Sequence, residues 1–370
     1  MASSKWSAPL ITLCLALLFR LIMIPASLLQ IHPYASDDAI GFAKTAALIA
    51  TEFSLSTPRS STYEIWGIFL APFWILPGPS SIYAHIFVAI LGAIAVYNIA
   101  VIGQTLYSPH AGVLAALPVA VYPSIVLTHS TLLREAAILF GLTTAARLLI
   151  ARPPQLSRHW AAIGAVIAII FTTIHRQENL PVYGLAILSA VTMNYWNHRF
   201  TKTTIVSFSI SSLTAIPFLG PIIKQINNLR SHRVGGRTKY LGSVQFDGIS
   251  EIIVFTWIGI GYFLFTPFPW MVETLSDVPI MFESLLSFFY LLFAIIGFRI
   301  LINRSPSITV GLAVGFLFGV SLYGLGTVNY GTAVRHRPMF LWVIFVFGAV
   351  AITSMFDSKS LPFWFTKRNE

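Results

Sequence analysis

The sequence predicts an all-α protein that crosses a membrane several times. Of its 370 residues, 56% are hydrophobic and only 10% are charged, and the mean hydropathy is +0.78. Because soluble domains carry roughly a quarter charged residues, this composition excludes a soluble globular protein and a disordered chain. Apolar runs of roughly 20 residues, the length that a helix needs to cross a bilayer, recur along the whole chain. A β-barrel would instead show short segments of alternating polarity.

About ten stretches are predicted to span the membrane. A further stretch, 252–267, is short and closed by two prolines, so we leave open whether it spans, re-enters or lies at the interface. The stretch 63–77 is also short, and Trp66 and Trp74 mark it as interfacial. The predicted spans are 9–30, 82–106, 110–128, 135–151, 160–175, 180–197, 204–223, 279–302, 307–328 and 338–356.

The first apolar run is expected to be a retained membrane helix. Lys5 precedes it, as in a signal peptide, but Arg20 interrupts it and no convincing small-residue cleavage site follows. The run also holds Cys14, the only cysteine in the sequence, so no disulfide can form within one chain. The nine histidines are scattered without the spacing of metal ligands, and we expect no metal site built from them.

The distribution of charge predicts the orientation in the membrane. With the N-terminus in the cytoplasm, the inner segments are short and basic, and their only acids are Asp357 and Glu370. Short basic loops on the cytoplasmic side follow the positive-inside rule. The outer face has mixed charge and two long loops, 31–81 and 224–278. We therefore predict one membrane domain, 1–370, in the cell membrane, with any active site on the extracytoplasmic side.

Two adjacent carboxylates, Asp37 and Asp38, open a predicted interfacial helix in the first outer loop. Ser36 or Asp37 is suited to cap this helix, and the helix dipole favours acids at its start. The other interpretation is a general base, in which one carboxylate removes a proton from an acceptor hydroxyl. Both interpretations stay open at this point. The predicted apolar face of the helix comprises Ile40, Ala43, Ala47 and Ala50.

A membrane helix followed by an Asp that begins an interfacial helix of the form D-A-x-x-aromatic-x-x-x-A resembles glycosyltransferases of the GT-C fold. Asp38, Ala39, Phe42 and Ala46 fill this pattern. The resemblance extends over roughly residues 10–180, and the relatives that it suggests are protein O-mannosyltransferases and lipid A aminoarabinose transferases. It implies a GT-C-like bundle with interfacial helices in the first outer loop.

Two further outer helix ends carry candidate substrate-binding residues. Arg134 and Glu135 stand at the outer end of a predicted span. A salt bridge or a first-turn Glu explains them without function, whereas the resemblance implies that Glu135 contributes to the active site. Arg176 and Glu178 occupy the next outer turn. They form either a solvated hairpin or part of the cavity that contains Asp38.

A basic stretch in the second outer loop, 224–239, contains no acid. Its Arg233 and Arg237 are expected either to bind anionic lipid headgroups or to hold the phosphate of a lipid-linked substrate, with adjacent glycines that permit close backbone approach. Nucleic acid fits poorly, because no aromatic residues interleave with the charge.

A second basic cluster, Arg335, His336 and Arg337, stands just before the last predicted span, in "GTAVRHRP", which also resembles a segment of many uncharacterised GT-C-like proteins. We expect an extended turn here, in which both arginines point into one pocket and clamp a phosphate. Interfacial anchoring by snorkelling side chains is the alternative.

These features predict a polyprenyl-phosphate-sugar-dependent glycosyltransferase that inverts the anomeric centre. Asp38, or Asp37, is the expected base; the expected substrates are a polyprenyl- or dolichyl-phosphate-linked sugar and an acceptor glycan, lipid or protein. No cofactor is required, because the adjacent acids form no DxD triad, although they could hold a divalent metal weakly. The alternatives are a lipid-linked glycan polymerase or ligase and a non-enzymatic transporter or flippase. Transporters usually place charges near the bilayer midplane, and here only Arg20 does so.

Overall fold

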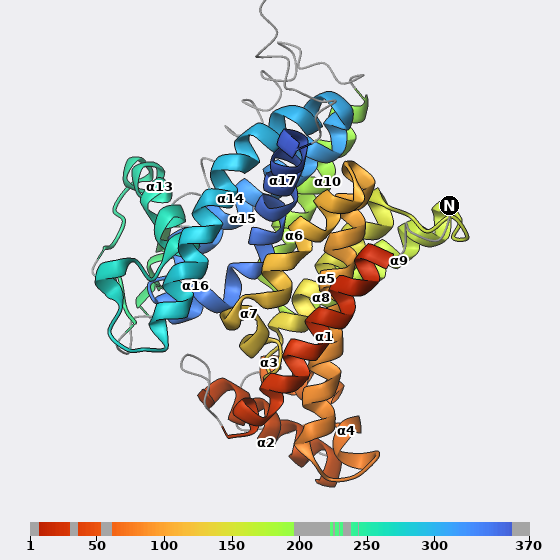
Figure 1. Ribbon diagram of the computed structural model, residues 1–370. Coiled ribbons are helices and arrows are strands. Elements are labelled where there is room, and N and C mark those ends of the chain that lie inside the picture. The colour runs from red at the N-terminus through yellow and green to blue at the C-terminus, as the bar shows by residue number, and fades with distance from the viewer. Residues whose placement is uncertain are drawn as a thin grey trace, which may run out of the picture. The chain divides into compact units, whose positions relative to one another are not determined.

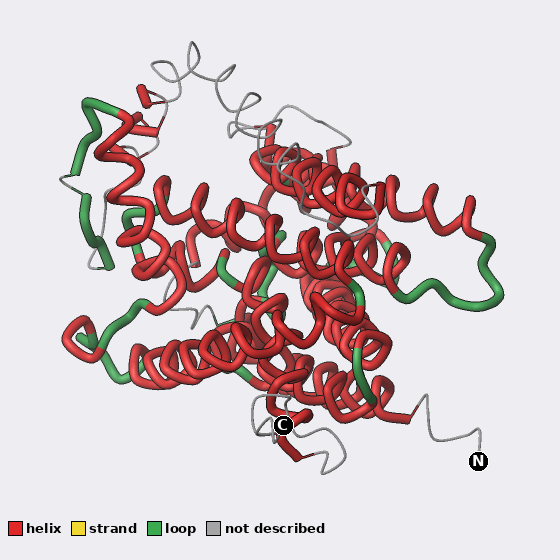
Figure 2. Tube along the Cα trace, turned by 90° about the horizontal axis from the view of Figure 1, so that it is seen from above, coloured by secondary structure: helices red, strands yellow, loops and turns green. Residues whose placement is uncertain are grey.

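The computed structural model describes residues 7–29, 36–52, 61–195, 223–224, 226–228, 230–231, 238–242 and 244–356. Within these ranges the chain is helical, and the only β pairing is an isolated bridge between Lys239 and Asn329. Figure 2 shows these helices joined by short loops. Helices satisfy their own backbone hydrogen bonds, as a bilayer core requires.

Six of the described helices are long and apolar enough to cross a membrane. They correspond to six of the predicted spans and place the protein in a lipid bilayer. Most of the predicted span 204–223 lies outside the described residues, and three others are shorter helices in the structure, so the count of about ten stays a prediction. The six helices cover Ala8–Leu28, Ser81–Leu106, Arg158–His175, Asp277–Arg304, Pro306–Gly326 and Pro338–Phe356.

The chain divides into two compact units, and Figure 1 labels the helices that belong to them. Unit 1 comprises residues 1–180, 289–300 and 342–370, and unit 2 comprises 181–288 and 301–341. The predicted single membrane domain stays a prediction. The helices of unit 1 are α1 (Ser7–Leu28), α2 (Ser36–Glu52), α3 (Ser61–Leu70), α4 (Pro72–Ile75), α5 (Ser81–Leu106), α6 (Pro109–Val121), α7 (Pro123–Thr128), α8 (Glu135–Ile150), α9 (Arg158–His175) and the 3-10 turn η1 (Gln177–Asn179), with parts of α14 (Asp277–Arg304) and α17 (Pro338–Phe356).

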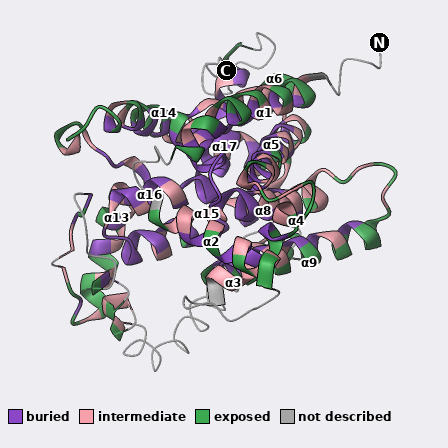
Figure 3. Ribbon diagram, turned by 90° about the horizontal axis from the view of Figure 1, so that it is seen from below, coloured by how far each residue is buried: buried purple, intermediate pink, exposed green. Residues whose placement is uncertain are grey.

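Helix α5 is the centre of unit 1. It packs against α1, α6 and α8, and most of its residues are buried, whereas α9 exposes much of its length (Figure 3). The crossing with α6 is close, because a Cβ built on Gly112 would lie 2.4 Å from the carbonyl oxygen of Ala100. A polar contact adds to the packing with α8, where Arg147 donates to Asn98 Oδ1 at 3.1 Å.

Serine side chains cap several of these helices. Ser80, Ser108 and Ser157 accept hydrogen bonds from the first turns of α5, α6 and α9. A hydroxyl in this position satisfies a backbone donor that the helix itself leaves without a partner. The sequence thus ends one helix and starts the next at short polar turns, which keeps consecutive helices adjacent.

Three sequence-based expectations for unit 1 are corrected. The predicted span 110–128 is broken, because Tyr122 precedes a proline and adopts a non-helical ψ of 120° before α7 begins. The buried stripe of α2 contains Phe42 and Ala46, and not the predicted face, whose members are only partly buried. Trp66, expected as an interfacial anchor, is fully buried.

Unit 2 contains a second set of packed helices. They are α10 (Leu180–Tyr195), α13 (Ile249–Phe265), η3 (Pro269–Met271), α15 (Pro306–Gly326) and α16 (Tyr330–His336), with the remaining parts of α14 and α17. Helices α13 and α15 cross at two glycines, Gly259 and Gly324, where either added Cβ would lie 2.7 Å from the backbone of the other helix. The stretch 252–267 is therefore a helix packed on α15; whether it spans the membrane stays open.

Arg230, in the segment that precedes α13, binds the end of α15. Its guanidinium donates to the carbonyl oxygens of Leu325 at 2.7 Å, Val244 at 3.1 Å and Leu241. The rings of Phe246 and Phe255 lie 5.1 and 4.8 Å from the guanidinium carbon. Burial lowers the pKa of Arg230, and the nearby Tyr240 raises it. The Arg230 guanidinium therefore stabilises the packing of this segment through these hydrogen bonds and ring contacts.

Candidate functional site

The predicted base, Asp38, is held by a tyrosine. Asp38 and Asp37 lie in the first turn of α2, where the positive end of the helix dipole favours carboxylates. The Tyr63 hydroxyl on α3 donates to Asp38 Oδ1 at 2.7 Å. The ring of Tyr63 stacks on Phe42, one turn further along α2, with centroids 4.5 Å apart. Asp38 is half-buried and Asp37 is exposed, so the structure distinguishes the two adjacent acids.

The second acid, Glu135, begins α8 and is buried. It follows a turn, residues 129–134, that α1, α3 and α9 hold in place. Ser130 donates to the carbonyl oxygen of Arg20 on α1 at 2.9 Å, and Thr131 lies 3.1 Å from the Ser27 hydroxyl, also on α1. Arg134 donates to the carbonyl oxygen of His175 at the end of α9.

Helix α3 connects the two acidic helix starts. Trp66, one turn after Tyr63, donates its indole N–H to the carbonyl oxygen of Leu132 at 3.0 Å. Tyr63 holds Asp38 and Trp66 holds the turn before Glu135, so one short helix contacts both carboxylate-bearing segments. The surrounding core, which includes Leu132 and Phe42, belongs to a single buried cluster of α2, α3, α5 and α8.

The turn after α9 supplies a third set of polar residues. Arg176 is buried, whereas Glu178 is exposed, so these two predicted site residues differ in their surroundings. Between them and α3 lies His175, whose ring contacts Trp66 and Phe69 with centroids 5.1 Å from each. His175 Nδ1 lies 2.7 Å from the Phe171 carbonyl oxygen, so this nitrogen carries the proton.

In unit 2, the expected extended turn at Arg335, His336 and Arg337 is wrong. Residues 330–336 form α16, and Arg337 continues in a helical conformation. The Asn329 side chain caps this helix by accepting from the Thr332 N–H at 3.2 Å, which explains why the segment is helical.

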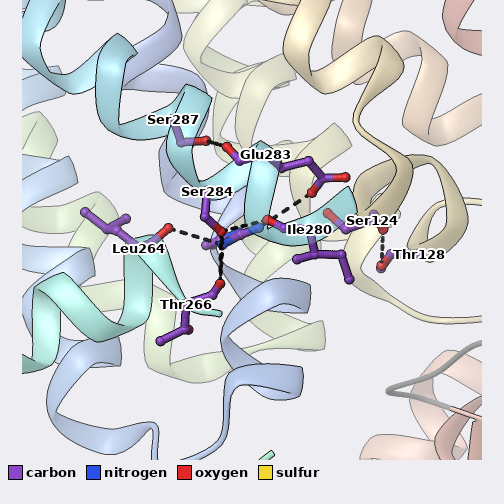
Figure 4. Close-up of polar contacts among 9 residues, drawn as sticks. Ser124, Thr128, Leu264, Thr266, Ile280, Glu283, Ser284 and Ser287 are labelled. Atoms are coloured by element: carbon purple, nitrogen blue, oxygen red, sulfur yellow. Dashed lines mark hydrogen bonds and ion pairs between the residues drawn. The ribbon is translucent and has the colours of Figure 1, made fainter. Parts of the chain in front are cut away.

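Arg337 makes its contacts inside unit 2. It is 2% exposed, and its guanidinium donates to the carbonyl oxygen of Thr266 at 2.7 Å and to the Ser284 hydroxyl at 2.8 Å. Glu283 lies 3.5 Å away as an ion-pair partner. Figure 4 shows Ser284 on α14 near the carbonyl groups of Leu264 and Thr266, with the Glu283 carboxylate on the other side of these contacts. The donors of Arg337 thus bind the protein itself, and its role as a phosphate clamp stays a prediction.

Several predicted residues are not brought into a site by these contacts. Arg233 and Arg237 lie outside the described residues. Arg335 is half-buried and His336 is buried against the ring of Tyr323, with centroids 5.6 Å apart. No three His, Cys, Asp or Glu side chains in the described part of the chain are placed to hold a metal ion.

Sequence reasoning missed Tyr63, His129 and Glu283, which hold the acids and arginines in place. Tyr63 could have been found, because it lies in the second interfacial segment and carries a hydroxyl. Glu283 gave one signal only: an acid inside an apolar run requires a partner.

In comparisons with known proteins, no family model, no curated protein and no solved structure matches the chain.

Proposed function

We propose that the protein is a membrane glycosyltransferase that uses a polyprenyl-phosphate-linked sugar as donor, with its active site around Asp38 in unit 1. The observation that supports this proposal is the 2.7 Å hydrogen bond from Tyr63 to Asp38, on the same short helix that holds the turn before Glu135. One oriented carboxylate with a second acid and two arginines, Arg134 and Arg176, on the same cluster of helix ends suits sugar transfer at a membrane surface.

In the proposed reaction, Asp38 accepts the proton of the acceptor hydroxyl as its oxygen attacks the anomeric carbon. The bond from that carbon to the phosphate oxygen breaks, and the polyprenyl phosphate leaves with the electron pair. Attack opposite the leaving group inverts the anomeric centre. The proton on Asp38 then passes to water. Tyr63 fixes the orientation of the carboxylate, and the guanidinium groups stabilise developing negative charge.

The finer architecture is part of the same proposal. We propose a GT-C-like bundle of about ten spans in the cell membrane, with α2, α3 and α4 as the interfacial helices of the first outer loop. The lipid-linked donor keeps its phosphate at headgroup depth, so a site on the extracytoplasmic surface can reach it without extracting the lipid. Of the basic residues predicted for the phosphate, Arg335 stays a candidate that donor kinetics can test.

The two alternative functions, a lipid-linked glycan polymerase or ligase and a transporter, do not require Asp38 as a general base. A lipid-linked glycan polymerase or ligase would use outer arginines without an essential Asp after the first helix. A transporter would require charges along a path through the bilayer. The only charge near the middle of α1, Arg20, is fully buried and bonded to helix carbonyls, which favours a structural role over a translocation path.

The test is incubation of the purified protein with acceptor membranes and a panel of radiolabelled polyprenyl-phosphate sugars. Asp38→Asn is expected to lower turnover by on the order of 100-fold or more, the usual effect of losing a general base. Asp37→Asn, one residue away and exposed, is the matched control and should retain most activity. Full activity in the Asp38→Asn variant would refute the mechanism, and no transfer from any donor would refute the function.

A further inference from the structure

Arg20 is a fully buried cation in the middle of a membrane helix. Its guanidinium donates to the carbonyl oxygens of Ala16 and Val119, each at 3.0 Å, and Nη2 lies 3.2 Å from His129 Nδ1. Among the described residues, no carboxylate lies within ion-pair distance of it, and its Nε has no hydrogen-bond partner. A buried charge is costly unless an opposite charge compensates it. The contacts with the carbonyls and His129 compensate this cost in part, and an anion farther away would stabilise the guanidinium further.

His129 lies beside Arg20 in the turn that leads to Glu135. A guanidinium can only donate, so His129 Nδ1 accepts and the ring proton stays on Nε2. Burial and the Arg20 charge hold the pKa of His129 well below its usual range, while the Glu135 carboxylate acts in the opposite direction. The neutral imidazole thus lies in the fields of one cation and one anion, Arg20 and Glu135.

The surroundings fit this arrangement closely. Gly92 on α5 leaves the space that both side chains occupy, since an added Cβ would lie 2.7 Å from Arg20 Nε and 2.9 Å from His129 Nδ1. The next residue of the turn, Ser130, donates to the carbonyl oxygen of Arg20 at 2.9 Å. Side chain and backbone of Arg20 therefore both hold the turn that precedes α8.

We infer that Arg20 and His129 are positioning residues for Glu135. The Arg20 guanidinium is a counter-charge of the Glu135 carboxylate across the imidazole of His129, and it fixes the turn from which α8 begins. The consequence for sugar transfer rests on the proposed function, whereas the charge pairing does not.

A double-mutant cycle measures the pairing without any substrate. The thermal unfolding midpoint is recorded in detergent for wild type, Arg20→Leu, Glu135→Gln and the double variant. If the charges are partners, Arg20→Leu alone leaves a buried carboxylate less compensated, and the double variant melts higher than Arg20→Leu. The matched control is Arg147→Leu, which removes another guanidinium of unit 1 at the far end of α8, and its effect should add to that of Glu135→Gln.

Additive effects of Arg20→Leu and Glu135→Gln would overturn the inference and reduce Arg20 to a cation held by carbonyls. Should Arg20→Leu fail to fold, Arg20→Gln, which removes the charge but keeps hydrogen-bond donors for the carbonyls, replaces it, and His129→Asn is added as a background. His129→Asn retains an acceptor for Arg20 but loses the imidazole ring, so the coupling of Arg20→Gln with Glu135→Gln should shrink in its background. Coupling that is unchanged there excludes His129 as the intermediary.

Transferase assays separate this inference from the proposed function. In an active enzyme, His129→Asn should lower kcat by roughly 10-fold with the donor KM little changed, and the loss should vanish in a Glu135→Gln background. A loss that persists in that background overturns the positioning role. Absence of transfer by wild type refutes only the proposed function, because the unfolding cycle still decides the charge pairing.

Discussion

Arg337 is the residue on which several segments of unit 2 depend. It binds the chain after α13 through Thr266, and α14 through Glu283 and Ser284. Both members of the ion pair are almost fully buried, at 2% and 3% exposure. Such a pair adds little net stability compared with apolar residues, but removal of one member leaves an uncompensated buried charge.

At the residue scale, Arg337→Ala is therefore predicted to destabilise the protein by about 3–5 kcal/mol. Arg337→Met combined with Glu283→Leu should be less destabilising than Arg337→Met alone, because no charge is left behind. Arg158→Ala, at an exposed position, should change stability by no more than about 0.5 kcal/mol. Unfolding midpoints in one detergent compare these variants. An unfolding midpoint of Arg337→Ala equal to that of wild type would show that the buried guanidinium does not stabilise the fold, and would favour Arg337 as a phosphate ligand.

The sequence alone identifies the charged residues but does not predict which of them contact one another in the folded protein. Arg134, Glu135 and Arg176 could be predicted because polar residues stand out at the ends of apolar runs. The partners could not: Glu283 lies within an apolar run, and Tyr63 looks like any interfacial tyrosine. The contacts of Arg337 could not be predicted either, because a cation before a span resembles a phosphate ligand and a buried ion-pair partner equally.

At the element scale, α13 depends on a glycine. A Cβ added to Gly259 would lie 2.7 Å from the carbonyl oxygen of Gly324 and 2.9 Å from its carbonyl carbon. These are backbone atoms of α15, so they cannot rotate away as a side chain could. Small residues of this kind let two membrane helices approach closely.

We predict opposite effects for two glycines on this helix. Gly259→Ala should push α13 away from α15 and destabilise the protein by about 1–3 kcal/mol. Gly261→Ala meets no atom within 4 Å and should stabilise by up to about 1 kcal/mol, because alanine is the better helix former. Thermal unfolding of the two variants in parallel is the measurement. Equal effects would show that the crossing is loose or that α13 adjusts without cost.

Helix existence could be predicted well from apolar length, whereas breaks and faces could not. The last predicted span, 338–356, coincides with α17, because a proline begins it and an uninterrupted apolar run follows. The span 110–128 contains an equally apolar run, yet Pro123 divides it into α6 and α7. The buried stripe of α2 was misassigned because alanine is only weakly hydrophobic and occurs on several faces of this helix, so its positions do not identify the buried face.

At the scale of the whole molecule, the charge distribution predicts an orientation, and the structure supplies positions at which to test it. Helix α9 is long and apolar enough to cross a membrane, and its 18 residues extend about 27 Å. Exposed polar turns precede and follow it. Because the turn before α9 is basic and the turn after it is mixed in charge, the positive-inside rule predicts that the first turn lies in the cytoplasm.

Two glutamines report on the two faces. Gln155 and Gln177 are both exposed and lie at opposite ends of α9. In a background in which the exposed Cys14 is replaced by serine, Gln177→Cys should react with an impermeant thiol reagent in intact cells, whereas Gln155→Cys should react only after permeabilisation. The substitutions replace the same residue type at exposed sites, so reactivity differs only through the side of the membrane. Labelling in the reverse order would place Glu135 and the candidate site in the cytoplasm, where a soluble nucleotide-sugar donor would suit the carboxylates better than a lipid-linked one.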